Sequence, residues 1–204
     1  MKVLTTMRFL EEELQSFREL GYDVIYKSED DKIELSKEIE DIDILVCFNP
    51  FDKIDIELFP KLKWIQLLSA GVNHVPKEKI LILETTHRGG YSIPIAEWII
   101  LKTLEMFKNS KEFYEKQKNK VWKINSHLLE LYGKTVGFVG TGSIAQEAAK
   151  RFEGFGVNII GFNTTGREVE HFHKCYSIDK IKEVIKDCHI VVVAAPYTEK
   201  THHL

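Results

Sequence analysis

Cysteine is scarce and charge is balanced in this chain of 204 residues. The three cysteines, Cys47, Cys175 and Cys188, are odd in number and lack the paired spacing of a metal site. Nothing supports a disulfide framework, so we expect reduced thiols. The 28 basic and 31 acidic residues give a formal net charge of -3. This small charge gives no reason to expect a nucleic acid or a membrane surface as a partner.

Long apolar runs are also absent. No run approaches the ~20 residues that a membrane-spanning helix needs. The stretch from Met1 to Gln15 meets charged residues too soon for the apolar core of a signal peptide. We therefore expect a cytoplasmic protein. Its length is enough for one large or two small domains with proper cores.

Two local patterns resemble binding sites but favour simpler interpretations. The letters HFHKC, residues 171–175, put two histidines and a cysteine on one side of an extended segment, but no fourth zinc ligand is evident nearby. We expect a surface loop there and no metal. The basic residues between Lys108 and Lys123 are interleaved with Glu112 and Glu115, which is typical of a solvated helix face.

The first 90 residues alternate short β-branched runs with helical patterns. A helical pattern covers residues 8–20 and an acidic stretch runs to residue 40. Strands are predicted at KVLTT (2–6), DVIY (23–26), ILVCF (44–48), WIQLLS (64–69) and LILETT (81–86). Strands that alternate with helices predict a parallel sheet covered on both faces, and hence a small α/β domain.

A long helix is predicted from Ile95 to about Lys118, where an apolar stripe replaces the strand pattern. Pro94 lies near its first turn, where a missing N–H costs nothing. Beyond this helix the sequence predicts a strand at 134–140, a helix at 143–156, a strand at 157–162, a helix at 177–188 and a strand at 190–196. This β-α-β-α-β order is one mononucleotide-binding half of a doubly wound fold.

A glycine-rich motif lies between the first of these strands and its helix. Gly140 permits the tight turn, and Gly142 removes a side chain that would keep the backbone away from a pyrophosphate. Ala145 takes the place of the third glycine, where only a small residue is needed. The free N–H groups at the start of the helix favour a phosphate. The alternative is a strand-turn-helix that binds no ligand.

The second strand of this half ends at Asn163, where a carboxylate would hold the ribose hydroxyls of NAD. An amide there does not repel a 2′-phosphate. Thr164, Thr165 and Arg167 supply two hydroxyls and a guanidinium that can bind phosphate. We therefore expect NADP as the cofactor, with NAD as the alternative. The stretch could also be a simple turn, because Asn, Thr and Gly are turn formers.

Four stretches make the chain resemble the D-isomer-specific 2-hydroxy-acid dehydrogenases, of the phosphoglycerate and glyoxylate/hydroxypyruvate reductase type. They are LLSAGVNHVP (67–76), IPIAEWII (93–100), GKTVGFVGTGSIAQEAAKRFEGFGVNIIGFNTTGR (133–167) and CHIVVVAAPYTEKTHHL (188–204). The resemblance implies a flavodoxin-like substrate domain over residues 1–92. A linker helix and the first half of a Rossmann cofactor domain would follow over residues 93–204. The implied reaction is hydride transfer between NADP(H) or NAD(H) and a small 2-keto or 2-hydroxy acid.

The resemblance also assigns roles to individual residues. The loop of Ala70, Gly71 and Val72 would hold the substrate carboxylate with its backbone N–H groups, although an ordinary βα turn is the simpler alternative. The helix that starts near Ile95 would lie at a homodimer interface. The implied cofactor-binding residues are Gly140, Thr141, Gly142, Ser143, Ile144, Asn163, Thr164, Thr165, Arg167, Ala195 and Pro196.

The family's catalytic Arg, Glu and His lie beyond the part of the pattern that this chain contains, so no catalytic residue is assigned here. His202 and His203 belong to a segment after the last predicted strand, where they would cap a helix or a loop. We expect the strand at 134–140 to keep an unpaired edge, which a longer form of the enzyme or another chain would cover.

Two other functions remain open from the sequence. The first is a non-catalytic module that binds NAD(P), and the second is an inactive remnant. The sequence leaves open which keto acid would be the substrate.

Overall fold

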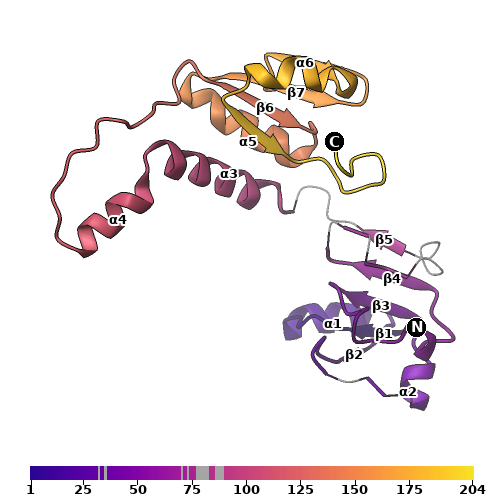
Figure 1. The fold of residues 1–204 in the computed structure, drawn as a ribbon. Helices are drawn as coiled ribbons and strands as arrows, with labels where there is room; N and C mark the ends of the chain where they lie inside the picture. The colour runs from indigo at the N-terminus through magenta and orange to yellow at the C-terminus, as the bar shows by residue number, and fades with distance from the viewer. Residues whose placement is uncertain (32, 35, 70, 73, 77–82, 86–89) are drawn as a thin grey trace. The chain divides into compact units, whose positions relative to one another are not determined.

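The chain folds into two compact units, Met1–Arg88 and Gly89–Leu204, in a computed structural model (Figure 1). The structure describes residues 1–31, 33–34, 36–69, 71–72, 74–76, 83–85 and 90–204. Each unit contains its own parallel sheet and its own core. None of the described helices is both long and apolar enough to cross a membrane.

The N-terminal unit contains five parallel strands in the order β2-β1-β3-β4-β5. The strands are β1 (Lys2–Thr5), β2 (Asp23–Tyr26), β3 (Ile44–Cys47), β4 (Trp64–Leu67) and β5 (Leu83–Thr85). Helices α1 (Glu11–Glu19) and α2 (Lys37–Glu40) and the 3-10 turn η1 (Ile56–Leu58) connect them. This is the flavodoxin-like strand order that the family resemblance implies.

Strand β3 is apolar along its whole length because both faces of the sheet are covered. All four of its residues are buried. Leu45 packs into the larger core with Ile39 and Phe59, while Ile44 and Val46 face the opposite layer with Val3. Alternate residues therefore serve opposite faces, as the two-residue period of a strand requires.

The C-terminal unit contains four parallel strands in the order β8-β7-β6-β9. They are β6 (Thr135–Val139), β7 (Asn158–Asn163), β8 (Lys174–Ser177) and β9 (Ile190–Val193). The helical elements are α3 (Ser92–Phe107), α4 (Ser110–Lys118), α5 (Ser143–Phe152), η3 (Glu153–Phe155), η4 (Ile178–Lys180), α6 (Ile181–Val184) and η5 (Ile185–Asp187). Taking β6 as the first strand, the order is 3-2-1-4, which is half of a Rossmann sheet.

Two layers of side chains cover this sheet. Helix α5 packs on one face, with Phe138 of β6 against Phe152 at a ring separation of 6.0 Å, and α3 packs against α5. On the other face, Ile181 and Ile185 pack against Phe162. Figure 1 shows α3 and α5 on one side of the sheet and α6 on the other.

The sheet of the C-terminal unit corrects two expectations. The sequence predicts a surface loop at residues 171–175, but Lys174 and Cys175 begin β8 and Cys175 is buried. The predicted unpaired edge on β6 is also wrong, because Val136 pairs with Ile159 on one side and Ile190 on the other. The open edge on that side of the sheet belongs to β9, where Val193 is 75% exposed.

The long helix predicted from Ile95 to Lys118 is two helices. Helix α3 ends at Phe107, and Asn109 adopts the left-handed conformation (φ 48°) before α4 begins. Asparagine tolerates this conformation better than most residues, which explains a break at this position. The predicted stripe of apolar residues is only partly buried, since Ile99 and Leu104 pack against the core whereas Trp98 and Met106 are exposed.

Acid should weaken the N-terminal unit through two aspartates at the amino edge of its sheet. Lys61 donates to Asp41 (2.6 Å) and its charge lies close, which holds the pKa of that carboxyl below its ordinary value of 3.8. Lys63 donates to Asp43 (2.6 Å), and the backbone N–H of Lys2 donates to it as well (2.9 Å); these bonds lower the pKa of Asp43. A carboxylate whose pKa is lower in the folded state than in the unfolded state stabilises the fold at a pH above its unfolded pKa. This stabilisation is lost as the pH falls through the folded pKa.

We therefore expect the double variant Asp41→Asn/Asp43→Asn to lose less stability than the wild type between pH 7 and pH 3. Urea unfolding at both pH values measures this difference. Asp52→Asn, a change at an exposed carboxylate outside these ion pairs, is the control. An equal loss in the double variant and the wild type would contradict the assignment.

Candidate functional site

The turn from β6 into α5 brings two backbone segments into close approach. Gly140 has φ +94°, which L side chains rarely adopt, and a Cβ built on it would lie 2.8 Å from the Ala195 nitrogen. The N–H of Gly140 donates to the Phe162 carbonyl (2.9 Å), and that of Ala194 donates to the Val139 carbonyl (2.8 Å). Only glycine fits here, because the conformation and the space both exclude a side chain.

The start of α5 has no side-chain cap for its first backbone N–H groups. The first helical bond runs from the Gln146 N–H to the Gly142 carbonyl (2.9 Å), so the N–H groups of Ser143 and Ile144 precede the helical ladder. Gly142 offers no side chain to cap them, and a Cβ built on it would meet nothing within 4 Å. These N–H groups and the helix dipole fit a pyrophosphate, which could approach the backbone where a side chain would stand.

Ala145 is fully buried, as are Ala148 and Ala149 on the same face of α5. These small residues let the helix lie close to the sheet. The sequence motif predicts a small residue at Ala145, and the structure places it at this contact.

Thr141 connects the glycine turn to the end of β7. Its hydroxyl accepts from the Asn163 side-chain amide (3.3 Å), and its carbonyl accepts from the Gln146 amide (2.9 Å). A Cβ on Gly161 would lie 2.5 Å from the Thr141 methyl group and 2.9 Å from the Phe172 ring. The sequence reasoning missed Gln146 and Gly161. An isolated glycine inside a strand is a known signal of close approach, so Gly161 could have been found.

Asn163 organises the loop that follows β7. Its side-chain oxygen accepts from the N–H groups of Thr165 (3.2 Å), Gly166 (2.7 Å) and Arg167 (3.1 Å). Its side-chain nitrogen also donates to the Arg167 carbonyl (2.9 Å). The amide is thus engaged in holding the turn, as expected for Asn in a loop.

The side chains of this loop face solvent. Thr164, Thr165 and Arg167 are exposed, and no ion pair is recorded for Arg167 within the described part of the chain. Gly166 has φ +75°, and a Cβ there would come within 2.8 Å of the Ser177 nitrogen, so β8 fixes the back of the loop. The loop therefore presents two hydroxyls and a guanidinium outward on a constrained backbone.

Ala195 and Pro196 follow β9 beside the glycine turn. Together with Val139, they line a pocket of about 370 Å³ on the α6 side of the sheet. The Thr201 hydroxyl donates to the Pro196 carbonyl (2.6 Å) and holds this segment in a turn. His202 also belongs to this turn, because its N–H donates to the Thr198 carbonyl (2.9 Å).

The loop predicted to bind a carboxylate follows β4 in the N-terminal unit. Ala70 lies outside the described residues. Gly71 and Val72 are exposed, and the Ser69 hydroxyl donates to the Gly71 carbonyl (3.1 Å). The N–H of Leu68 donates to the Cys47 carbonyl (2.9 Å), which places this loop next to the end of β3.

The described residues contain no group of three or more His, Cys, Asp or Glu side chains that could hold a metal ion. The histidines of the HFHKC segment have structural partners. His171 pairs with Glu153 (3.0 Å), and His173 accepts from the Ile159 N–H (3.0 Å).

Comparison with known proteins matches both units. Residues 3–80 match the family model for the D-isomer specific 2-hydroxyacid dehydrogenase catalytic domain, and residues 100–204 match the NAD binding domain of the same family.

Individual relatives cover the whole chain. It is 30% identical to D-3-phosphoglycerate dehydrogenase of Methanocaldococcus jannaschii, over 100% of this chain and 40% of the relative. It is 31% identical to glyoxylate reductase of Thermofilum pendens, over 100% of this chain and 64% of the relative. Among solved structures, D-lactate dehydrogenase of Aquifex aeolicus, complexed with NAD and lactic acid, superposes with a TM-score of 0.76 at 25% identity, over 100% of this chain and 63% of that one. The chain therefore spans less than two thirds of each of these proteins.

The two glycines of the turn should respond differently to substitution. Gly140→Ala combines a left-handed φ with a backbone clash, and we expect it to lower the free energy of unfolding by about 2–4 kcal/mol. Gly142→Ala meets no neighbour, so its unfolding free energy should stay within about 0.5 kcal/mol of the wild type. Its affinity for a pyrophosphate-containing ligand should nevertheless fall about tenfold or more.

Urea unfolding and calorimetric titration measure the two effects. Equal destabilisation by both substitutions would contradict the geometry of the turn. Undiminished binding by Gly142→Ala would contradict its role in ligand approach.

Proposed function

This chain belongs to the D-isomer-specific 2-hydroxyacid dehydrogenase family, and from that premise we propose that it binds a nicotinamide coenzyme and a small 2-keto acid. Residues 93–204 would serve as the coenzyme half and residues 1–92 as the substrate half. The reaction is hydride transfer between the coenzyme and a 2-keto or 2-hydroxy acid, and no catalytic residue for it is assigned in this chain.

One observation carries the coenzyme proposal. Gly140 is forced into a turn, no side chain caps the first N–H groups of the helix α5 that follows, and the Cβ position of Gly142 beside them is open. A buried alanine at position 145 keeps the helix close to the sheet behind them. A structural turn alone would explain Gly140. It would not explain Gly142, whose Cβ position is open and whose φ of -75° suits any residue.

Each part of the site has a task in this proposal. When bound, the coenzyme supplies the hydride that the keto carbon takes up. Ser143 and Ile144 hold the pyrophosphate with their N–H groups, and Ala195 and Pro196 form the wall beside the nicotinamide ribose. In the N-terminal unit, the N–H groups of the loop at Gly71 and Val72 hold the substrate carboxylate and fix its orientation.

NADP is the proposed coenzyme, with NAD as the alternative. No carboxylate stands at the end of β7 to repel a 2′-phosphate, because that place is taken by Asn163 and its amide is engaged in the loop. The exposed Arg167 guanidinium and the hydroxyls of Thr164 and Thr165 supply donors for the phosphate.

The coenzyme proposal predicts the effect of charge reversal. Arg167→Glu should raise the dissociation constant for NADPH about 10- to 100-fold, since charge-assisted hydrogen bonds contribute about 1.5–3 kcal/mol. The dissociation constant for NADH should change little. Lys150→Glu, at an exposed position on the far end of α5, is the matched charge control.

Thermal unfolding with each coenzyme gives the readout, because a ligand at about 100 times its dissociation constant stabilises the fold by about 2.7 kcal/mol. An unchanged preference in Arg167→Glu would contradict the choice of NADP. Tight binding without NADPH oxidation on glyoxylate, hydroxypyruvate or pyruvate would favour a non-catalytic binding module. The absence of a shift with either coenzyme would contradict the proposal and favour an inactive remnant.

We also propose that the protein forms a homodimer through the C-terminal unit. Large apolar side chains are exposed on α3, with Trp98 at 58% and Met106 at 74%. The segment after α4 exposes Trp122 at 96% and Ile124 at 82%, and it is tied to α3 by the Leu129 N–H bond to the Phe107 carbonyl (3.0 Å). Large apolar side chains exposed on these elements favour an interaction site.

Light scattering after size exclusion tests the dimer. We expect the wild type to have twice the 23.7 kDa mass of one chain. Trp98→Glu/Met106→Glu should elute as a monomer, because two buried charges would oppose association. Leu20→Glu, at an equally exposed apolar residue of the N-terminal unit, should remain dimeric. A monomeric wild type would refute the dimer.

A further inference from the structure

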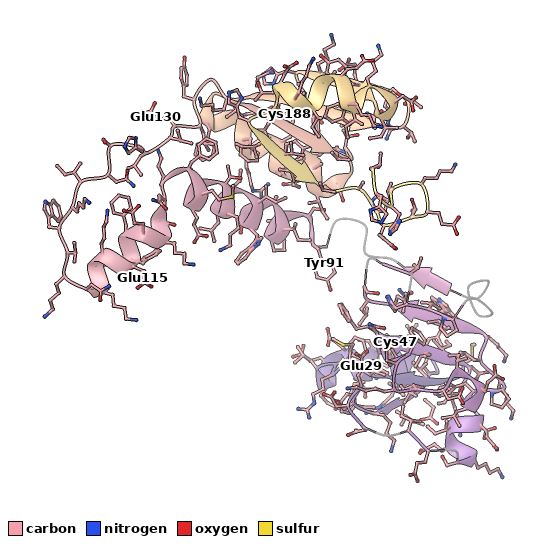
Figure 2. All side chains as sticks on the ribbon, viewed as in Figure 1. Glu29, Cys47, Tyr91, Glu115, Glu130 and Cys188 are labelled. Atoms are coloured by element: carbon pink, nitrogen blue, oxygen red, sulfur yellow. The ribbon has the colours of Figure 1, made fainter. Side chains whose placement is uncertain are left out.

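A single carboxylate ties together three strand ends in the N-terminal unit. One oxygen of Glu29 accepts from the Thr6 hydroxyl (2.8 Å), the Phe48 N–H (2.7 Å) and the Asn49 N–H (3.1 Å). Thr6 follows β1, whereas Phe48 and Asn49 follow β3. Figure 2 labels Glu29 beside Cys47, the last residue of β3. Burial and then the Glu29 charge raise the pKa of the Cys47 thiol to about 12, consistent with this proximity.

Glu29 is presented by a hydrogen-bonded turn after β2. The Ser28 N–H donates to the Asp31 carboxylate (3.0 Å), and the Asp31 N–H donates to the Ser28 carbonyl (3.1 Å). Because the strand order is β2-β1-β3, Glu29 reaches across the end of β1 to the loop of β3. The backbone of Glu29 is therefore held by the bonds of this turn, and its carboxylate is held by the three hydrogen bonds that it accepts.

The sheet topology gives this place significance. In open α/β sheets, ligands bind outside the carboxyl ends of the strands where the strand order reverses. In the order β2-β1-β3-β4-β5 the reversal lies between β1 and β3, and there the Glu29 carboxylate takes the N–H groups that an anion would use. The next anion position along the same edge is the loop after β4, which contains Gly71 and Val72.

The loop after β3 contacts the loop after β4 through side chains. The Phe51 and His74 rings lie 5.8 Å apart. His74 Nε2 lies 3.3 Å from the Ser69 hydroxyl, and that hydroxyl donates to the Gly71 carbonyl (3.1 Å).

The loop after β3 is held by its own hydrogen bonds, so a shift at Phe48 and Asn49 would also move Phe51. The Pro50 carbonyl accepts from the N–H groups of Lys53 and Ile54, both at 2.9 Å. A path of side-chain and backbone contacts therefore runs from Glu29 through this turn and His74 to Gly71.

We propose that Glu29 is a positioning residue for the loop at Gly71 and Val72, acting through the loop after β3. The inference rests on the proposed function of Gly71 and Val72 in binding the substrate carboxylate. Glu29 contacts no substrate in this account. It fixes the neighbouring loop, and it keeps a second anion out of the reversal point, so that the carboxylate of a keto acid is held at one place.

Backbone amide hydrogen exchange, resolved by NMR on the full chain, tests the positioning. Glu29→Ala should raise exchange about tenfold or more at Phe48 and Asn49, because charge-assisted bonds are lost. It should also raise exchange at Val75, whose N–H donates to the Val72 carbonyl (3.1 Å), while Leu4 and Leu45 in the core keep their rates. Glu29→Gln retains an acceptor oxygen in the same place and should retain most of the protection.

Asp30→Ala is the matched control. It removes a neighbouring carboxylate that pairs with Lys53 of the same loop (2.5 Å), but not the bonds to Phe48 and Asn49. We expect exchange at Val75 to be unchanged in this variant. The dissociation constant for pyruvate, used as the probe, should rise about tenfold in Glu29→Ala and stay unchanged in Asp30→Ala. NADPH affinity should be unaffected in both.

Three results would overturn the inference. They are increased exchange confined to Phe48 and Asn49, increased exchange throughout the core of the N-terminal unit, and equal effects of the Gln and Ala substitutions. If the wild type does not bind pyruvate but Glu29→Ala changes amide exchange as expected, the proposed binding of a keto acid is contradicted and the positioning role of Glu29 is not. Normal pyruvate binding by Glu29→Ala would contradict the inference alone.

Discussion

The backbone of Gly140 passes so close to Ala195 that a single methyl group would not fit between them. The remaining site geometry in the C-terminal unit depends on this approach. It joins the carboxyl ends of β6 and β9, and it turns the chain sharply enough that α5 starts at the edge of the sheet. The first N–H groups of α5 have no side-chain cap, while Ala145 and its buried neighbours hold the helix against the strands. A wider turn would carry the helix start away from the strand ends.

This turn was predictable because local and long-range requirements agree in the same few residues. A buried strand, two glycines and a helix of small residues follow one another without interruption. The strand β8 was not predictable in the same way. Its four residues, Lys174–Ser177, have mixed polarity and follow a histidine-rich segment, so the local sequence does not predict a strand. The strand forms because these residues pair with β7. Without β8, the strand β9 would be counted as the third strand of the C-terminal unit, and β6 would lie at the edge of the sheet. With β8 as the third strand, β9 is the fourth and pairs with β6 on its other side.

The binding residues show a similar division between chemistry and geometry. The absence of a carboxylate at the end of β7 follows from the sequence alone. The engagement of Asn163 does not, since its oxygen gathers three N–H groups of the following loop only in the folded chain. Glu29 gave no local signal, because its three donors come from segments about 20 residues away in either direction. The break at Asn109 had a weak signal, which the continuous apolar pattern around it outweighed.

The account as a whole rests on a pyrophosphate bound by the first N–H groups of α5. The most direct measurement is an NMR titration of the isotope-labelled chain with NADPH, following each backbone amide. The account predicts the largest shifts at Gly142, Ser143 and Ile144, with further shifts at Thr165 and Arg167. Saturable binding that leaves these amides unmoved, or the absence of any saturable shift, would contradict it.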